Sequence, residues 1–248
     1  MRRGAFEQFA RLDQDHWWFR GRRAVYLGLL EQVLAGARPA RALDLGCGPG
    51  GFLPGLARLC ERVVAADSDL DSLQALAWDQ RVLMGAHALP FADRSFDLVT
   101  LFDVIEHLDD DLGALREVNR VLGPKGLVAV SVPAYPWLFS NNDRVAMHRR
   151  RYTRKRLAGT LEQAGFEVLR NTHANVLLTP VIVPLTLVSK AVEATPLSRV
   201  DSEHTNLSWP LPRFAHHLLA RVFASELALT RRFDAPFGHS IAAIARRR

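Results

Sequence analysis

Residues 42–51 read Ala-Leu-Asp-Leu-Gly-Cys-Gly-Pro-Gly-Gly, and this stretch decides the fold of the 248-residue chain. An apolar run ends at Leu45, glycines occupy positions 46, 48, 50 and 51, and a helical pattern begins near Phe52. The order is strand, tight turn and helix N-terminus. Glycine lets the backbone turn and lets a ligand approach closely, and the first N–H groups of a helix favour polar or anionic groups. The stretch therefore predicts a ligand-binding turn.

Two ligand classes fit this turn. Gly46, Gly48 and Gly51 satisfy the spacing G-x-G-x-x-G, so an NAD-dependent oxidoreductase is one alternative. Asp44, however, stands two residues before the first glycine. Its carboxylate accepts hydrogen bonds from an ammonium or a hydroxyl but repels a pyrophosphate. The acid therefore favours a cationic or neutral nucleoside.

The rest of the chain alternates strand and helix patterns, which is typical of a parallel α/β sheet. We expect strands at residues 42–45, 62–66, 81–84, 96–102, 127–132, 166–171 and 240–245. Helical periodicity covers residues 24–34, 52–59, 71–78, 109–122, 153–164 and 212–233. Asp67 follows the second strand, 23 positions after Asp44. This is close to the interval at which an acid meets a ribose diol in a βαβ nucleotide site.

Several motifs resemble class I S-adenosylmethionine-dependent methyltransferases over about residues 40–133. They are Leu43–Gly50, Asp67, Leu89-Pro90-Phe91, Ser95–Val99, Glu106-His107-Leu108 and Leu122–Gly126. The resemblance implies a Rossmann-like, doubly wound, seven-stranded sheet whose last strand is antiparallel. The chain adds a helical insertion before that strand.

The resemblance also implies S-adenosyl-L-methionine as cofactor, with Asp44 and the glycines at its methionine end and Asp67 on its ribose. We expect the site to include Asp44, Gly46, Cys47, Gly48, Asp67, Ser68, Ala86, His87 and Phe102. Family members commonly have an acid contacting adenine shortly before Leu-Pro-Phe. Gly85 takes that place here, so backbone groups and apolar packing, with His87 nearby, are expected to hold the adenine.

Methyl transfer needs an aligned acceptor and, for a hydroxyl or ammonium, removal of a proton. The candidates for this base are His148, then His107 and Glu106. Asp103-x-x-Glu106-His107 also resembles an element of quinone-type O-methyltransferases that is associated with a divalent metal. Such residues also pack or hydrogen-bond without one, and we expect no metal.

We divide the chain into four parts: an N-terminal helical lid (1–39), an S-adenosylmethionine-binding core (40–173), an apolar helical insertion or cap (174–238), and a closing strand with a basic tail (239–248). The lid carries His16-Trp17-Trp18-Phe19, which either packs on the sheet or covers the ligands. Residues 174–189 carry no charge, yet they fall short of the roughly 20 residues of a membrane span and contain Pro180 and Pro184. A packed cap, an apolar substrate channel and an interfacial patch stay open.

The formal charge is +6, with arginine runs at 149–151, 154–156 and 246–248. This excess leaves RNA modification or nucleic-acid binding as an alternative function, although no signature for methylation of an exocyclic amine is present. Two cysteines and a charged N-terminus indicate a cytoplasmic protein, with peripheral contact at the inner membrane face left open. We expect methylation of oxygen or nitrogen in a small-molecule or lipid-like acceptor. Neither the acceptor nor the oligomeric state follows from the sequence.

Overall fold

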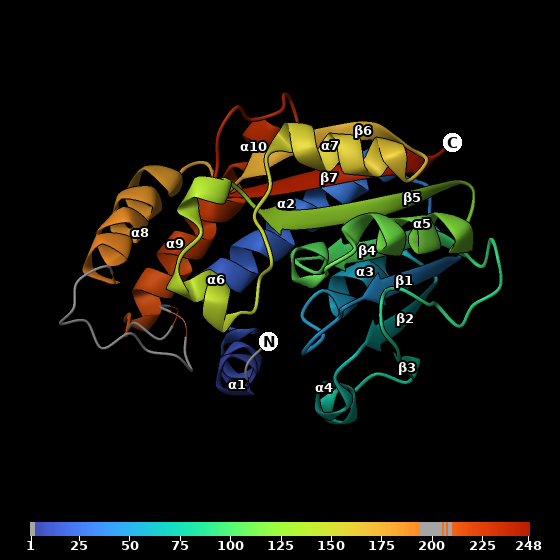
Figure 1. Cartoon of the computed structure of the whole chain (residues 1–248), viewed down its shortest axis with the longest axis horizontal. Coiled ribbons are helices and arrows are strands. Elements are labelled where there is room, and N and C mark those ends of the chain that lie inside the picture. The colour runs from blue at the N-terminus through green and yellow to red at the C-terminus, as the bar shows by residue number, and fades with distance from the viewer. Residues whose placement is uncertain (1–2, 194–204, 206, 208–209) are drawn as a thin grey trace.

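The computed structural model describes residues 3–193, 205, 207 and 210–248, and in them seven strands form one sheet (Figure 1). The spatial order is β3-β2-β1-β4-β5-β7-β6. The strands are β1 Arg41–Leu45, β2 Arg62–Asp67, β3 Arg81–Leu83, β4 Phe96–Phe102, β5 Leu122–Pro133, β6 Phe166–Ala174 and β7 Ser240–Arg247. Only β7 runs antiparallel, against both β5 and β6. The expected Rossmann-like sheet with its antiparallel last strand is thereby confirmed.

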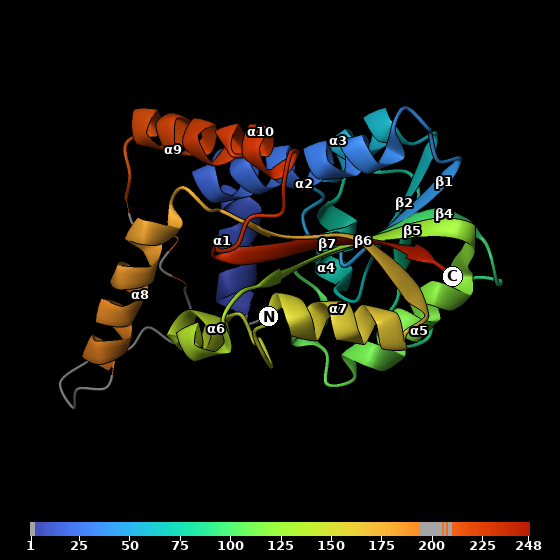
Figure 2. The same ribbon diagram turned by 90° about the horizontal axis from the view of Figure 1, so that it is seen from above.

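Helices cover both faces of this sheet (Figure 2). One layer holds α2 Trp17–Leu34, α3 Leu53–Leu59, α9 Arg213–Ser225 and α10 Leu227–Thr230. The other holds α5 Asp111–Val121, α6 Asn141–Val145 and α7 Arg154–Gln163. The remaining helical segments are α1 Arg3–Leu12, α4 Leu70–Ala75, α8 Thr179–Glu193, η1 Ile105–His107 and η2 Pro136–Leu138. None of the helices within the described ranges has both the length and the apolar character to cross a membrane.

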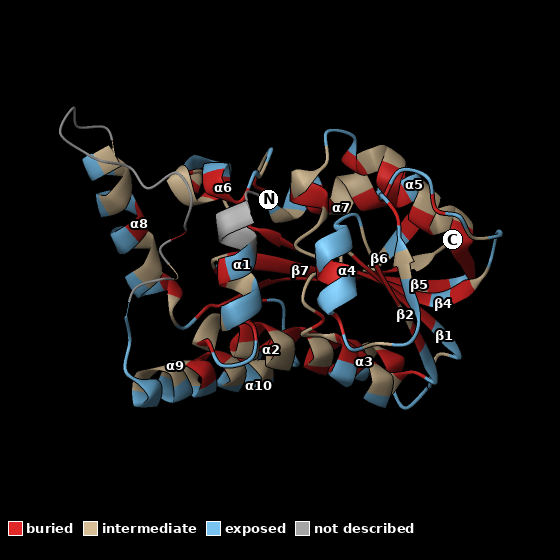
Figure 3. Ribbon diagram, turned by 90° about the horizontal axis from the view of Figure 1, so that it is seen from below, coloured by how far each residue is buried: buried red, intermediate tan, exposed pale blue. Residues whose placement is uncertain are grey.

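The core lies on both faces of the central strands, because successive side chains of a strand point to opposite sides. Leu43, Val99 and Val130 face α5 and α7, whereas Ala42, Leu98 and Ala129 face α2 and α3. Figure 3 shows these strands as the most continuously buried part of the molecule. Apolar residues on both faces explain why the strands read as nearly unbroken apolar runs.

The aromatic cluster at the start of α2 packs against α9. Phe223 is fully buried and its ring lies 6.5 Å from that of Trp17 and 5.9 Å from that of Trp18. A Cβ at Gly21 would approach the Phe223 ring to 2.2 Å, so the glycine lets the two helices come together. Trp17 and Trp18 also border the central cavity. The cluster therefore packs against α9 and also borders the cavity.

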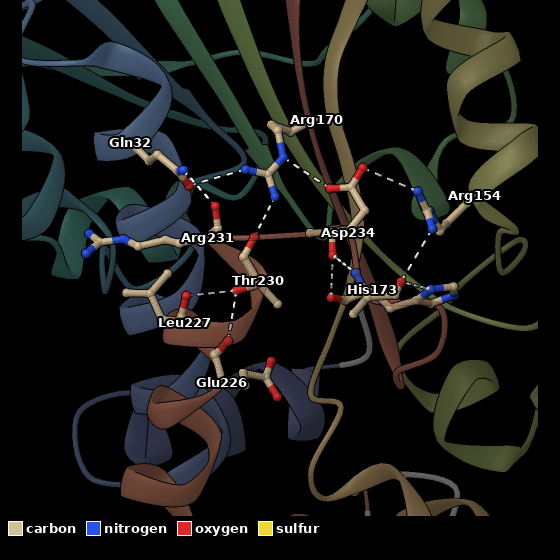
Figure 4. Close-up of polar contacts among 11 residues, drawn as sticks. Gln32, Arg154, Arg170, His173, Glu226, Leu227, Thr230, Arg231 and Asp234 are labelled. Carbon is tan, nitrogen blue, oxygen red and sulfur yellow. Dashed lines mark hydrogen bonds and ion pairs between the residues drawn. The ribbon is translucent and has the colours of Figure 1, made fainter.

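Polar contacts connect the end of α10 and the residues that follow it to the sheet (Figure 4). Arg170 of β6 contacts Asp234 (Nε to Oδ1, 3.1 Å), the carbonyl of Thr230 and the side chain of Gln32. Arg154 also pairs with Asp234, at 3.5 Å. These contacts fix the end of the insertion to β6 and to α2.

Several element boundaries differ from the sequence prediction; α2 begins at Trp17 and not at residue 24, and β6 extends to Ala174 and not to residue 171. The helix expected to reach Trp78 ends at Ala75, because Arg81 donates to the carbonyls of Leu73 and Leu76 and the indole of Trp78 donates to Val63. These side chains replace the last helical hydrogen bonds. β5 begins at Leu122 and not at Leu127, since Leu122 already pairs with Phe96 of β4; the register then shifts, and the pairing resumes between Leu127 and Leu98.

We predict that Phe223→Ala lowers the free energy of unfolding by about 3–5 kcal/mol, because the cavity left between α2 and α9 cannot collapse fully. Phe214→Ala on the same helix is the matched control, since its ring is exposed, and a change within about 0.5 kcal/mol is expected. Urea denaturation measures both. Equal losses would contradict the assigned packing of α9 on α2.

Candidate active site

The glycine turn after β1 extends the pairing of β1 with β2. The N–H groups of Gly46 and Cys47 both donate to the carbonyl of Ala66, at 2.7 and 3.0 Å. Gly46 has φ +77°, and a Cβ there would meet Val104 at 2.5 Å, so only glycine fits this position. The turn is thereby held open at the carboxyl edge of the sheet, where ligands of open α/β sheets bind.

Asp67 ends β2 beside this turn. Its carboxylate accepts from the N–H of Gly48 (2.8 Å) and from the N–H of Asp69 (3.0 Å). These bonds fix the direction of the side chain while each oxygen keeps a further acceptor position. Asp67 and Ser68 both border the central cavity.

Asp44 is buried on β1 between β2 and β4. Its Oδ1 accepts a hydrogen bond of 2.6 Å from the hydroxyl of Thr100, its neighbour in register on β4. Burial raises the pKa of Asp44 to about 7, although the Thr100 hydrogen bond opposes the shift. A cation beside this carboxylate would restore its charged form.

Arg22 is a buried cation at the same cavity. It forms an ion pair with Asp103 at the end of β4, and its guanidinium lies 5.8–5.9 Å from the ring centres of Trp18, Phe19, Tyr26 and Phe52. The Nε atom has no partner among the described residues. The sequence analysis did not single out Arg22, because its ion-pair partner Asp103 and the ring of Phe52 come from distant segments.

Glu106, His107 and His148 meet on the other side of the cavity, with ligand-type atoms within 4.8 Å of one another. Both carboxylate oxygens of fully buried Glu106 lack a partner in the described part of the chain. Burial, reinforced by Asp103, raises the pKa of Glu106 well above its usual value. Burial and the nearby His148 lower the pKa of His107 to about 3. This set suits a hydroxyl-bearing ligand or one divalent cation.

His148 is oriented by a buried carboxylate. Its Nδ1 lies 2.8 Å from Oδ1 of Asp143, which also accepts from Nε of Arg151 at 2.8 Å. Burial alone would raise the pKa of Asp143, but hydrogen bonds from His148 and Arg151 lower it below the usual range. An ionised Asp143 requires a proton on Nδ1, which leaves Nε2 of neutral His148 as an acceptor. Ser140-x-x-Asp143 is a capping-box spacing, but it gave no sign of this second role.

A cavity of about 1390 Å³ joins these groups. Single-ligand pockets measure roughly 300–1,000 Å³, so there is room for two ligands. The predicted residues that border it are Asp44, Gly46, Cys47, Gly48, Asp67, Ser68, Ala86, Phe102, Glu106, His107 and His148. His87 is not among its lining residues, because its exposed ring turns away to the carbonyl of Asp110, 3.0 Å from Nε2. The far end of the cavity is apolar and is formed by α8 and by residues 207, 211 and 219.

Comparisons with known proteins agree with this geometry. A family model described as "Methyltransferase domain" matches residues 43–130. A Mycobacterium tuberculosis protein named "Probable S-adenosylmethionine-dependent methyltransferase" is 34% identical over 162 residues, which is 62% of this chain and 57% of that protein. The ubiquinone biosynthesis O-methyltransferase of Parvibaculum lavamentivorans is 30% identical over 123 residues, 46% of this chain and 48% of that protein. The chain thus matches less than two thirds of either relative's length.

The fold is also similar to that of solved structures. An N-methyltransferase from Bradyrhizobium japonicum, in complex with S-adenosyl-L-homocysteine, has a TM-score of 0.58 at 14% identity, covering 98% of this chain and 96% of that one. At this identity the likeness shows the fold alone. The residues present fit the same cofactor class, since buried and ordered carboxylates at Asp44 and Asp67 flank an open glycine turn.

The buried Asp44 gives the stability a defined pH dependence. Its folded-state pKa of about 7 exceeds the unfolded value of 3.8. Between these pH values the folded state keeps a proton that the unfolded state releases, so the free energy of unfolding falls as pH rises. Asp44→Asn keeps an acceptor for Thr100 and does not ionise. We predict that the free energy of unfolding of Asp44→Asn, relative to that of the wild type, is higher at about pH 8 than at about pH 5, by on the order of 2 kcal/mol.

Urea unfolding of both proteins without cofactor measures this difference. Because other titrations are common to both proteins, the comparison isolates residue 44. An equal gain at the two pH values would contradict a buried, proton-binding Asp44.

Proposed function

Because the chain belongs to the class I S-adenosylmethionine-dependent methyltransferase family, we propose that it methylates an oxygen or nitrogen of a small-molecule or lipid-like acceptor. One observation carries the proposal. The acids around the glycine turn and the Asp143–His148 pair border one and the same cavity. A candidate donor site and an oriented proton acceptor therefore border a single cavity.

We assign the cofactor contacts from charge and position. Asp67 would accept from the ribose hydroxyls through the positions that Gly48 and Asp69 leave open. Asp44 would pair with the methionine ammonium, whose charge would favour ionisation of this buried carboxyl. Arg22 is the buried cation near these acids, and we assign it to the methionine carboxylate.

His148 is our candidate for the general base. When bound, S-adenosylmethionine supplies a methyl group on a sulfonium, which a lone pair of the acceptor displaces in line. Nε2 of His148 would take the proton that the acceptor loses, because Asp143 holds the Nδ1 proton and orients the ring. Glu106 and His107 lie next to it and would hydrogen-bond the acceptor's polar group.

The apolar end of the cavity favours an acceptor with an apolar body. Leu178, Ile182 and Leu185 of the segment leading into and along α8 line it, as do Leu207 and Leu219. Such a lining offers few groups to a sugar or a nucleotide but buries a hydrocarbon favourably. We also propose that the protein contacts a membrane peripherally, where a lipid-like acceptor would be concentrated.

The arginine runs argue against the alternative of an RNA substrate. Arg149 pairs with Asp109, Arg150 with Asp111, Arg151 with Asp143 and Arg154 with Asp234. Arginines already paired with carboxylates present less charge to phosphates. Steeply salt-dependent RNA binding with methyl incorporation would favour the alternative.

Asp67→Ala tests the cofactor assignment. We predict a ten- to hundredfold loss of affinity for S-adenosylhomocysteine, because a charged hydrogen-bonded contact is removed. Isothermal titration calorimetry gives the affinity. Asp79→Ala is the matched control, since this exposed acid lies outside the cavity, and it should bind like the wild type. Unchanged affinity in Asp67→Ala would refute the ribose assignment.

His148→Gln tests the base. With an acceptor identified by labelled-methyl transfer, we predict a loss of kcat of about 10²–10⁴ near neutral pH that lessens as pH rises, with unchanged affinity for S-adenosylhomocysteine. His217→Gln, an exposed histidine on α9, serves as the control and should keep full activity. Normal turnover of His148→Gln would remove His148 as base. Loss of wild-type activity on chelation, reversed by Mg²⁺, would assign Glu106, His107 and His148 to a metal ion.

A further inference from the structure

The helix α8 exposes an unusually apolar face. Val181, Leu185, Val188 and Val192 recur at helical spacing along it, and each is between 51% and 61% exposed. A stripe at intervals of three and four residues lies on one side of a helix. Contiguous apolar surface of this kind marks a binding face for a partner or a membrane.

Two other elements at the same end of the molecule, α9 and η2, also expose apolar side chains. On α9, Phe214 is 72% exposed and Leu218 follows one turn later. Trp137 of η2 is also exposed, and its carbonyl accepts a hydrogen bond of 2.6 Å from Nζ of Lys190 on α8. In Figure 1, α8 forms the edge of the molecule farthest from β1 and β3, and Figure 2 shows α9 at the same end of the molecule but separated from α8. We call the set Val181, Leu185, Val188, Val192, Phe214, Leu218 and Trp137 the apolar end face.

The charges around the apolar end face are positive. Among the described residues from α8 to α10, the acids are Glu193 and Glu226. The carboxylate of Glu193 accepts a hydrogen bond from the N–H of Asn141 and pairs with Arg144. The carboxylate of buried Glu226 accepts hydrogen bonds from the N–H groups of Asn175 and Val176. The cations stay toward solvent, with Lys190 on α8 and the exposed Arg213 and Arg221 on α9.

The apolar end face is continuous with the central cavity. Val181 and Leu185 line the cavity and are also more than half exposed, so they stand at its mouth. An apolar molecule that arrives at this face would enter the cavity without leaving apolar surroundings. A folded protein partner seated on the same residues would instead cover the entrance.

We propose that the apolar end face docks on a lipid bilayer that contains anionic lipids. Apolar side chains insert at the acyl boundary, a tryptophan sits at the headgroup level, and surrounding cations pair with lipid phosphates. This arrangement is that of an interfacial helix, which lies on the membrane and does not span it. The purpose of this docking, delivery of a lipid-like acceptor, rests on the proposed function. Binding to vesicles can be measured without turnover.

Co-sedimentation of the full chain with vesicles tests the proposal. The wild type is expected to bind vesicles of phosphatidylcholine with phosphatidylglycerol, to bind phosphatidylcholine alone more weakly, and to lose affinity as salt rises. Val188→Asp should weaken binding at least about tenfold, since an apolar side chain that would insert into the bilayer becomes a charge that anionic lipid repels. Arg213→Glu should weaken binding to anionic vesicles severalfold, given about fivefold for each cation near the surface.

Matched controls separate docking from folding and from net charge. Leu83→Asp replaces an equally exposed apolar residue at the far edge of the sheet, and Arg62→Glu makes the same charge change on β2. Both should bind vesicles like the wild type. All four variants should bind S-adenosylhomocysteine normally, because none of these residues lines the cavity.

Three results would overturn the proposal. One is a wild type that binds S-adenosylhomocysteine but no vesicles, which would leave the proposed methyl transfer standing but remove the proposed membrane contact. Another is equal binding by Val188→Asp and Leu83→Asp. The third is a wild-type dimer in sedimentation velocity that Val188→Asp converts to monomer while vesicles go unbound, which would make a second copy the occupant of this face.

Discussion

The parallel pairing of β1 with its neighbours β2 and β4 determines where every candidate functional group lies. Asp44 stands level with Ala65 on β2 and with Thr100 on β4, so all three strands deliver their carboxyl ends to one edge. The pairing continues past the strand ends, where Gly46 bonds back to Ala66 and Gly48 to Asp67. A shift of this register would separate the glycine turn from its acids. The chemistry proposed here therefore depends on the sheet more than on any single loop.

The part of the site assigned to the cofactor could be predicted from the sequence, because the patterns that indicate it are local. Apolar runs, glycines and an acid at a fixed interval define strand ends, and strand ends of a parallel sheet meet at one edge. The seven strands and the antiparallel direction of the last one, β7, followed from the family resemblance, whereas the spatial order of the strands was seen only in the structure. His87 failed to reach the cavity because the Asp110 carbonyl, 23 residues away, holds its ring outside. A contact of that range leaves no mark in local sequence.

The part of the site assigned to the acceptor could be predicted only in part, because long-range contacts position its residues. His148 stood out as a histidine after the fifth strand, but its orientation depends on Asp143, which the sequence analysis did not single out. Arg22 is positioned by rings of its own helix together with Asp103 and Phe52, and these last two are far from it in the sequence. Apolar composition identified the segment after residue 174, while its place at the cavity mouth required the packing of α8 and α9. Long-range side-chain contacts, and not backbone patterns, build this part of the site.

The central claim is that one cavity holds the methyl donor and the base His148 on either side of the acceptor. A crystal structure of the complex with S-adenosylhomocysteine tests it most directly, through the distance between the ligand's sulfur and Nε2 of His148. The methyl group and one acceptor atom must fit between them, with the acceptor atom about 3 Å from the methyl carbon and about 3 Å from Nε2, so the account predicts roughly 6–8 Å with open space between the two atoms. A sulfur atom that faces away from His148, or one separated from it by protein atoms, would contradict the account.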